Sequence, residues 1–95
     1  MNLSENLDRI LPLVKKPGRY IGGELNSCVK NWEEVDVRFV LVFPDMYEIG
    51  MSHFGLQILY HILNDRNHTL AERCFCPDID MEREMRAHGM PLFSL

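Results

Sequence analysis

The sequence has no long apolar run and no concentration of positive charge. Its longest apolar stretches, such as residues 39–44, are far shorter than the roughly 20 residues that span a bilayer. No basic segment leads into an apolar one at the N-terminus. The formal net charge is -4 and the longest basic run is Lys15-Lys16, whereas phosphate binding needs clustered positive charge. We therefore expect a cytoplasmic protein, with no membrane span and no nucleic-acid partner in this segment.

Cysteine is also scarce, and the patterns of common catalytic and metal sites are absent. Cys28, Cys74 and Cys76 are odd in number, and the C-x-C spacing is poor geometry for a disulfide, so we expect reduced thiols. No C-x2-C or H-x3-H spacing is present, and we predict no metal site. Because the chain also lacks a P-loop, a nucleophile elbow and a nucleophile-base pair, no residue is predicted to be catalytic, and enzymatic activity stays an open question.

The remaining composition is that of a packed globular protein. A length of 95 residues predicts one domain at most, and a composition with 46% hydrophobic and 25% charged residues predicts a packed core. Residues 1–34 are expected to form an N-terminal arm. It contains an amphipathic helix over residues 4–16 that Pro12 interrupts, followed by turns and extended pieces. Trp32 is expected to plug this arm onto the main domain.

Residues 35–95 alternate between strand and helix patterns, and we expect them to form one domain. A strand over residues 35–43 has apolar residues on both faces, which is typical of a buried central strand. A second strand covers residues 70–76, and a third begins at Pro91. The intervening helices should bury Leu56, Leu59, Tyr60 and Leu63 in the first and Met81 and Met85 in the second, with Gly89 as the C-terminal cap.

This alternation predicts an α/β fold with a Rossmann-like parallel sheet, incomplete at about three strands, with flanking helices and an N-terminal helical and extended arm. Parallel sheets are usually larger and covered on both faces, so such a chain would leave an open edge. We expect that it is part of a longer protein, or that self-association through the exposed sheet edge completes it.

The turn after the first strand is the candidate binding site, because ligands of open α/β sheets bind beyond the carboxyl ends of the strands. Its candidate cofactor-binding residues are Asp45, Tyr47, Glu48, Gly50, Ser52, His53 and Gly55. Two interpretations remain open. The turn could hold an anionic or amide-bearing part of a cofactor on its backbone NH groups. Alternatively, Asp45 and Ser52 could only cap helices, with Glu48 closing a capping box, while Gly50 and Gly55 serve the tight turn and close packing of helix on strand.

Other polar residues allow a functional and a structural interpretation. His53 could be a metal or cobalt ligand, a general base, or a solvent-facing residue at a helix start. Four acidic residues crowd the start of the last helix, namely Asp78, Asp80, Glu82 and Glu84. They could coordinate a cation, although their position favours a simple interaction with the helix dipole.

Several segments together resemble a known family. They are residues 16–24 (KPGRYIGGE), 35–39 (VDVRF), 43–45 (FPD) and 50–60 (GMSHFGLQILY), continuing through 71–73 (AER) and 91–95 (PLFSL). As a joint pattern they resemble the N-terminal region of bacterial radical SAM proteins that carry a B12-binding domain.

The resemblance implies a Rossmann-like, cobalamin-binding-type domain that precedes a radical SAM domain. Cobalamin is the cofactor it implies for this segment, whereas a 4Fe-4S cluster and S-adenosylmethionine would belong to a C-terminal radical SAM domain outside this chain. The base-off cobalamin motif D-x-H-x-x-G and the cluster motif C-x3-C-x2-C are both absent. We therefore expect no histidine-ligated cobalt and no cluster here.

Two functions remain in competition. In the first, the chain is a cofactor-binding-type segment of a radical SAM enzyme that is not catalytic by itself, with residues 45–55 lining cobalamin or the interface to the radical SAM domain. In the second, it is a structural or interaction module that binds no cofactor, or a small regulator that associates with itself.

Overall fold

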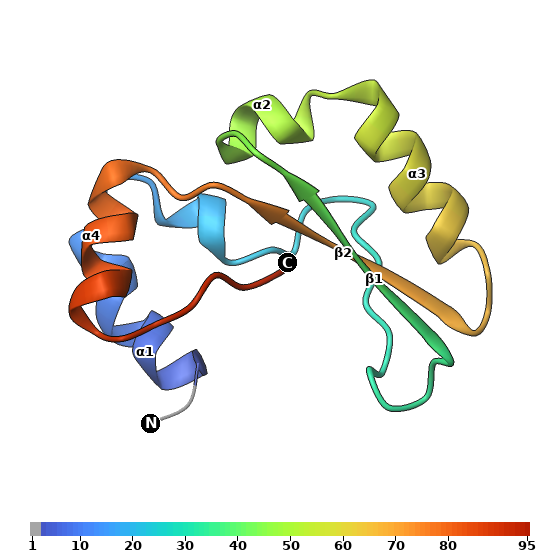
Figure 1. The fold of residues 1–95 in the computed structure, drawn as a ribbon, viewed down its shortest axis with the longest axis horizontal. Helices are drawn as coiled ribbons and strands as arrows, with labels where there is room; N and C mark the ends of the chain where they lie inside the picture. The colour runs from blue at the N-terminus through green and yellow to red at the C-terminus, as the bar shows by residue number, and fades with distance from the viewer. Residues whose placement is uncertain (1–2) are drawn as a thin grey trace.

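The computed structural model describes residues 3–95, which form helices around a short parallel sheet (Figure 1). The elements in chain order are α1 (Leu3–Ile10), the 3-10 turns η1 (Leu11–Leu13) and η2 (Pro17–Tyr20), β1 (Val37–Phe43), α2 (Tyr47–Met51), α3 (Phe54–Asn64), β2 (Thr69–Phe75) and α4 (Ile79–Ala87). The expected helices and the first two strands are present. Among the described residues, no helix has the length and apolar character needed to cross a membrane.

β1 and β2 lie side by side and parallel, in a register that runs from Val37 opposite Thr69 to Phe43 opposite Phe75. The chain between them passes through α2 and α3, and α3 packs mainly against β2. This strand-helix-strand crossover confirms the predicted α/β fold with an open parallel sheet, and it is consistent with an incomplete Rossmann-like domain.

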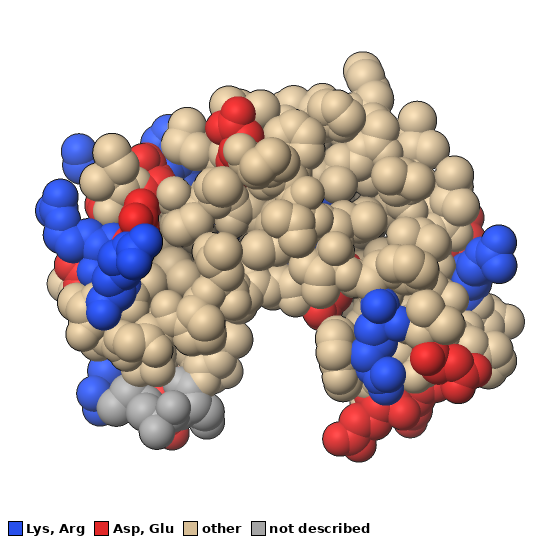
Figure 2. Space-filling view, viewed as in Figure 1, with Lys and Arg blue, Asp and Glu red and all other residues tan. Residues whose placement is uncertain are grey.

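The prediction that the first strand is buried and central is wrong for the described chain. β1 is exposed over most of its length, and the exposed fractions of Phe39 and Val42 are 41% and 68%. β1 carries apolar residues on both faces as predicted, but within residues 3–95 only β2 pairs with it. On the face drawn in Figure 2, most Lys, Arg, Asp and Glu side chains gather toward the two ends, and few lie between them.

β2 is the buried strand, and six of its seven residues are buried. β1 occupies one of its edges, while other parts of the chain satisfy the opposite edge. There the side-chain amide of Asn64 bonds both the NH and the carbonyl of Ala71, at 2.9 and 3.0 Å. Further along, Arg73 and Leu95 exchange two backbone hydrogen bonds, at 2.9 and 2.6 Å.

This exchange corrects the expected third strand. Two residues that each donate to the other form the bonded pair of an antiparallel ladder, whereas parallel strands do not exchange bonds in this way. Residues 91–95 are extended but form no strand, and the sheet has two strands rather than about three. The sequence pattern indicated an extended segment but not its direction.

α3 confirms part of the expected apolar face. Leu56 and Tyr60 are buried, but Leu59 is 51% exposed, contrary to the prediction. The buried polar residue Asn64 shifts the inward face of the helix, because it must reach the edge of β2. At 100° per residue, this face leaves Leu59 on the flank.

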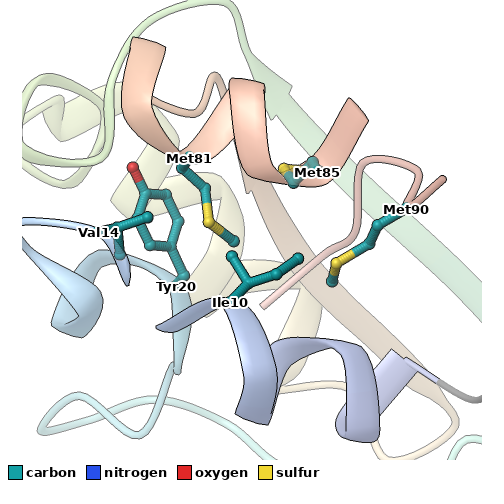
Figure 3. Close-up of a cluster of buried hydrophobic side chains, with 6 residues drawn as sticks. All are labelled: Ile10, Val14, Tyr20, Met81, Met85 and Met90. Carbon is teal, nitrogen blue, oxygen red and sulfur yellow. The ribbon is translucent and has the colours of Figure 1, made fainter. Parts of the chain in front are cut away.

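A second core joins α1 to α4 (Figure 3). It consists of the buried residues Ile10, Val14, Tyr20, Met81, Met85 and Met90. Met81 and Met85 face inward as predicted, and Gly89 follows α4 with a φ of +63°, which is the conformation that favours glycine after a helix. The expected interruption at Pro12 is also present, since α1 ends at Ile10 and a 3-10 turn follows.

Trp32 is not the buried plug expected from the sequence. Its side chain is 48% exposed and lies against the guanidinium of Arg38, which is 5.2 Å from the ring centroid. Lys30 attaches the arm instead. Its ammonium donates to the backbone carbonyls of Asn64, Arg66 and Thr69, at 2.6, 2.9 and 2.6 Å. A cation at the C-terminus of α3 also suits the negative end of the helix dipole.

We predict that Lys30→Met destabilises the protein by about 2 kcal/mol, because three carbonyls lose a charged donor. The free energy of unfolding in urea measures this effect. Lys16→Met is the matched control, since no hydrogen bond of the Lys16 ammonium is found among the described residues, and it should change stability by less than about 0.5 kcal/mol. Equal effects of the two substitutions would contradict the role of Lys30.

Candidate functional site at the carboxyl edge of the sheet

The loops that follow β1 and β2 meet at the carboxyl edge of the sheet. The amide of Cys76 donates to the carbonyl of Asp45 at 2.9 Å, so the two strand-Pro-Asp turns are tied together. α2 begins two residues after Asp45, and α4 begins three residues after Cys76. This edge is therefore the place where a ligand of an open α/β sheet would bind.

The polar side chains at the start of the turn have partners within the chain. The Asp45 carboxylate accepts from the backbone amide of Met46 at 2.7 Å, and the Tyr47 hydroxyl donates to Glu24 at 2.8 Å. The Ser52 hydroxyl donates to the Glu48 carbonyl at 2.7 Å. The structure thus brings the predicted residues to one edge but gives them structural partners there.

Arg19, which sequence reasoning did not single out as a site residue, bridges both loops. Its guanidinium bonds Glu48 of α2 at 2.6 Å and Asp78, the N-cap of α4, at 2.8 Å. The guanidinium lowers the pKa of both carboxyl groups below their usual range, and the two carboxylates raise the pKa of Arg19. The N-terminal arm therefore occupies the carboxyl edge. Residues so distant in sequence give no local signal of such a pair.

The two glycines of the turn have different roles. Gly50 is buried in α2 and lies against the ring of Phe75, so that a Cβ at this position would overlap the ring. A Cβ at Gly55 would meet only the imidazole of His53, at 3.0 Å. Gly50 thus permits α2 to lie close over the end of β2, in accordance with the packing interpretation of the sequence.

The capping interpretation is wrong in its details. Met46 is the N-cap of α2 and makes no side-chain capping bond, so Asp45 and Glu48 do not form a capping box. His53, rather than Ser52, caps α3, because its Nδ1 accepts the backbone amide of Leu56 at 3.1 Å. The His53 ring also packs against Phe43, with 5.0 Å between the ring centroids.

The hydrogen bond that His53 Nδ1 accepts from the Leu56 amide bears on whether this imidazole can ligate cobalt. A neutral imidazole that accepts at Nδ1 carries its proton on Nε2, so neither nitrogen offers a free lone pair to a metal. Ligating histidines instead usually donate their other NH to a carboxylate or carbonyl. The residues at this edge therefore do not fit a histidine-ligated cobalamin while His53 caps α3. Among residues 3–95, no group of three or more His, Cys, Asp or Glu side chains lies together as a metal site.

A second polar cluster lies beneath the turn and centres on Arg73 of β2, whose side chain is 3% exposed. Its guanidinium lies 3.9 Å from the centroid of the Tyr60 ring and bonds Gln57 at 3.1 Å and Glu24 at 3.4 Å. Burial, together with the Glu24 carboxylate, raises the pKa of Tyr47 to about 12, so its phenol stays protonated and donates. An arginine in the middle of a predicted strand was the signal that could have indicated this cluster, because arginine is rarely buried without partners.

The cysteines behave as the sequence predicted. Cys28, Cys74 and Cys76 are all free. Cys74 is buried in β2, and burial raises the pKa of its thiol, which makes it a poor nucleophile. Cys76 is exposed beyond the end of β2.

Part of the chain matches the model of a known protein family. The family model described as "Radical SAM proteins, N-terminal" matches residues 55–95, which comprise most of α3, all of β2 and α4, and the extended C-terminal segment. Residues 55–95, somewhat less than half of the chain, are thus similar to the N-terminal region of radical SAM proteins. This range contains the whole Arg73 strand and the Asp78 cap, while most of the turn lies before it. No curated protein and no solved structure matches the chain.

We predict that Gly50→Ala destabilises the protein by about 2 kcal/mol, since the added methyl group must displace the buried Phe75 ring. Thermal and urea unfolding measure the loss. Gly18→Ala is the control, because a Cβ there meets open space, and it should be close to neutral. A neutral Gly50→Ala would show that α2 does not lie as close to β2 as described.

The Arg19 pairs should make stability depend on pH in the acid range. Because both carboxyl pKa values are lowered on folding, their contribution is present above the ordinary carboxyl pKa near 4 and is lost as the pH falls through the lowered values. We expect the difference in unfolding free energy between the parent protein and Arg19→Ala to shrink between about pH 6 and pH 3. A difference that is constant over this range would contradict the pairing.

Proposed function

We propose that this chain is the N-terminal segment of a radical SAM protein, shaped as the first part of a B12-binding-type domain and not catalytic by itself. The family match of residues 55–95 is the observation that carries the proposal. The parallel strand-helix-strand crossover and the meeting of both loops at the carboxyl edge are consistent with it.

The exposed strand supports a larger assembly. β1 has apolar residues on both faces, yet it is mostly exposed and, within residues 3–95, paired on one edge only. A strand of this composition is stable when it is covered on both faces and paired on both edges. In the proposal, the C-terminal radical SAM domain, or further strands before it, covers β1, and that domain carries the 4Fe-4S cluster and S-adenosylmethionine.

Cobalamin is the cofactor that the proposal assigns to the completed domain, at the edge formed by the turn from Asp45 to Gly55. Histidine ligation of cobalt is not part of it, because His53 is used to cap α3. The chain's own contribution would be the shape of the edge, with Gly50 admitting a close approach of α2 to Phe75.

The second candidate is a structural or interaction module without a cofactor. It is favoured by the internal pairing of the turn, since Asp45, Tyr47, Glu48 and His53 all have partners among the described residues. In this candidate the apolar surface of β1 docks another part of the protein or a second copy of the chain.

The two candidates are separated by titrating hydroxocobalamin into the protein encoded by the complete reading frame, provided that the frame continues past Leu95 and includes a C-x3-C-x2-C motif. A saturable change in the visible spectrum is expected from the cofactor-binding proposal. The same spectrum at high cobalamin excess would leave only the interaction module. A stop codon directly after Leu95, together with a stable dimer in sedimentation, would instead favour a self-associating regulator.

A further inference from the structure

Arg19 belongs to the N-terminal arm but closes the edge at which both strands end. Its side chain is 10% exposed and bonds one carboxylate from each loop, Glu48 after β1 and Asp78 after β2. The neighbouring Tyr20 adds a third tie, because its hydroxyl accepts the backbone amide of Asp78 at 3.1 Å. The position that a ligand would take in an open α/β sheet is therefore covered by the protein's own arm.

The space below Arg19 is too small for a ligand as it stands. Arg19 and Tyr20 line a cavity of about 20 Å³, whose other walls include Phe75, Cys76 and Pro77 at the end of β2. This volume is sufficient for about one water molecule. A groove of about 350 Å³ adjoins it on the side of α4 and shares Cys76, Pro77, Met85 and Leu92 with it. The groove is within the size range of small-molecule sites, roughly 300 to 1,000 Å³.

We propose that Arg19 is a clasp that ties the arm across the carboxyl edge of the sheet, and that the edge opens to a ligand only when this clasp is broken. The inference rests on the proposed function in one respect, namely that the edge is where a ligand binds. The opening itself does not depend on which ligand is bound.

The chain is built so that the clasp can move without unfolding its surroundings. The Glu48 and Asp78 side chains are 49% and 40% exposed, so water can replace the guanidinium at both carboxylates. Tyr20 is anchored in the α1–α4 core (Figure 3), and this anchor does not require the Arg19 side chain.

The test measures local opening in the whole chain after Arg19→Ala. The backbone amide of Asp78 should exchange with solvent about tenfold faster, because Arg19 no longer holds its loop to Glu48 and the bond to the Tyr20 hydroxyl alone must protect this amide. Met85, which is 5% exposed and lines both the cavity and the groove, should be oxidised faster by hydrogen peroxide. Met81, which is completely buried, and the amides of β2 should not change, and they serve as internal controls for global unfolding.

Two further variants make the result decisive. Glu48→Gln removes one of the two carboxylate partners and should raise both readouts by a smaller factor, so the test survives if Arg19→Ala does not fold. Arg38→Ala removes an arginine that bonds the Trp32 carbonyl far along β1 from this edge, and it should change neither readout. Unchanged Asp78 exchange and Met85 oxidation in both Arg19→Ala and Glu48→Gln would overturn the clasp. So would a parallel rise in Met81 oxidation and β2 exchange, which would mean that Arg19 supports the whole fold.

The outcome is separable from the cofactor proposal. Local opening in Arg19→Ala without any spectral change of hydroxocobalamin would support the clasp and reject cobalamin. A spectral change with cobalamin but no local opening in Arg19→Ala would support cobalamin binding and reject the clasp.

Discussion

The structure depends on the burial of β2 and on the pairing of both its edges. β1 hydrogen-bonds the backbone groups along one edge of β2. Asn64 and Leu95 bond backbone groups of Ala71 and Arg73 along the other edge, so these groups need no further strand as a partner. Arg73 in this strand then requires partners of its own. They come from α3 through Gln57 and Tyr60 and from the arm through Glu24. One buried strand thus fixes the position of both a helix and a distant extended segment.

The local sequence pattern predicts where most helices and strands lie, but not how deeply each one is buried. The periodicity of residues 35–43 and 70–76 identified two strands, and the paired Pro-Asp turns located their common edge, because these signals depend on neighbouring residues. The pattern could not show that β1 is exposed, since an apolar strand has the same sequence whether or not another strand covers it. The direction of residues 91–95 was likewise missed. A single pair of bonds between Arg73 and Leu95 sets it, and such pairing is long-range.

In the candidate site, too, the residue types could be predicted from the sequence but their contacts could not. The turn was recognised as rich in polar groups, but its capping was misassigned because an imidazole and a hydroxyl at adjacent positions, His53 and Ser52, can both accept an amide at a helix start. In the structure, the Leu56 amide donates to His53 and not to Ser52. The partners of Glu48 and Tyr47 lie in the arm, at Arg19 and Glu24, and no spacing rule connects residues that are more than 20 positions apart.

These contacts set a condition on any function of the edge. The polar side chains of the turn, namely Asp45, Tyr47, Glu48 and His53, already have partners among the described residues, so a ligand at this edge must compete with the arm for the carboxylates of Glu48 and Asp78. Competition is less costly at these two carboxylates, because both are partly hydrated and lose only a charged partner that water can replace. For Glu24 and Arg73 the balance is opposite, since breaking a buried pair leaves an uncompensated charge. The arm can therefore yield at Arg19 while it stays attached at Glu24 and Lys30, and the position of these attachments limits the opening to the carboxyl edge.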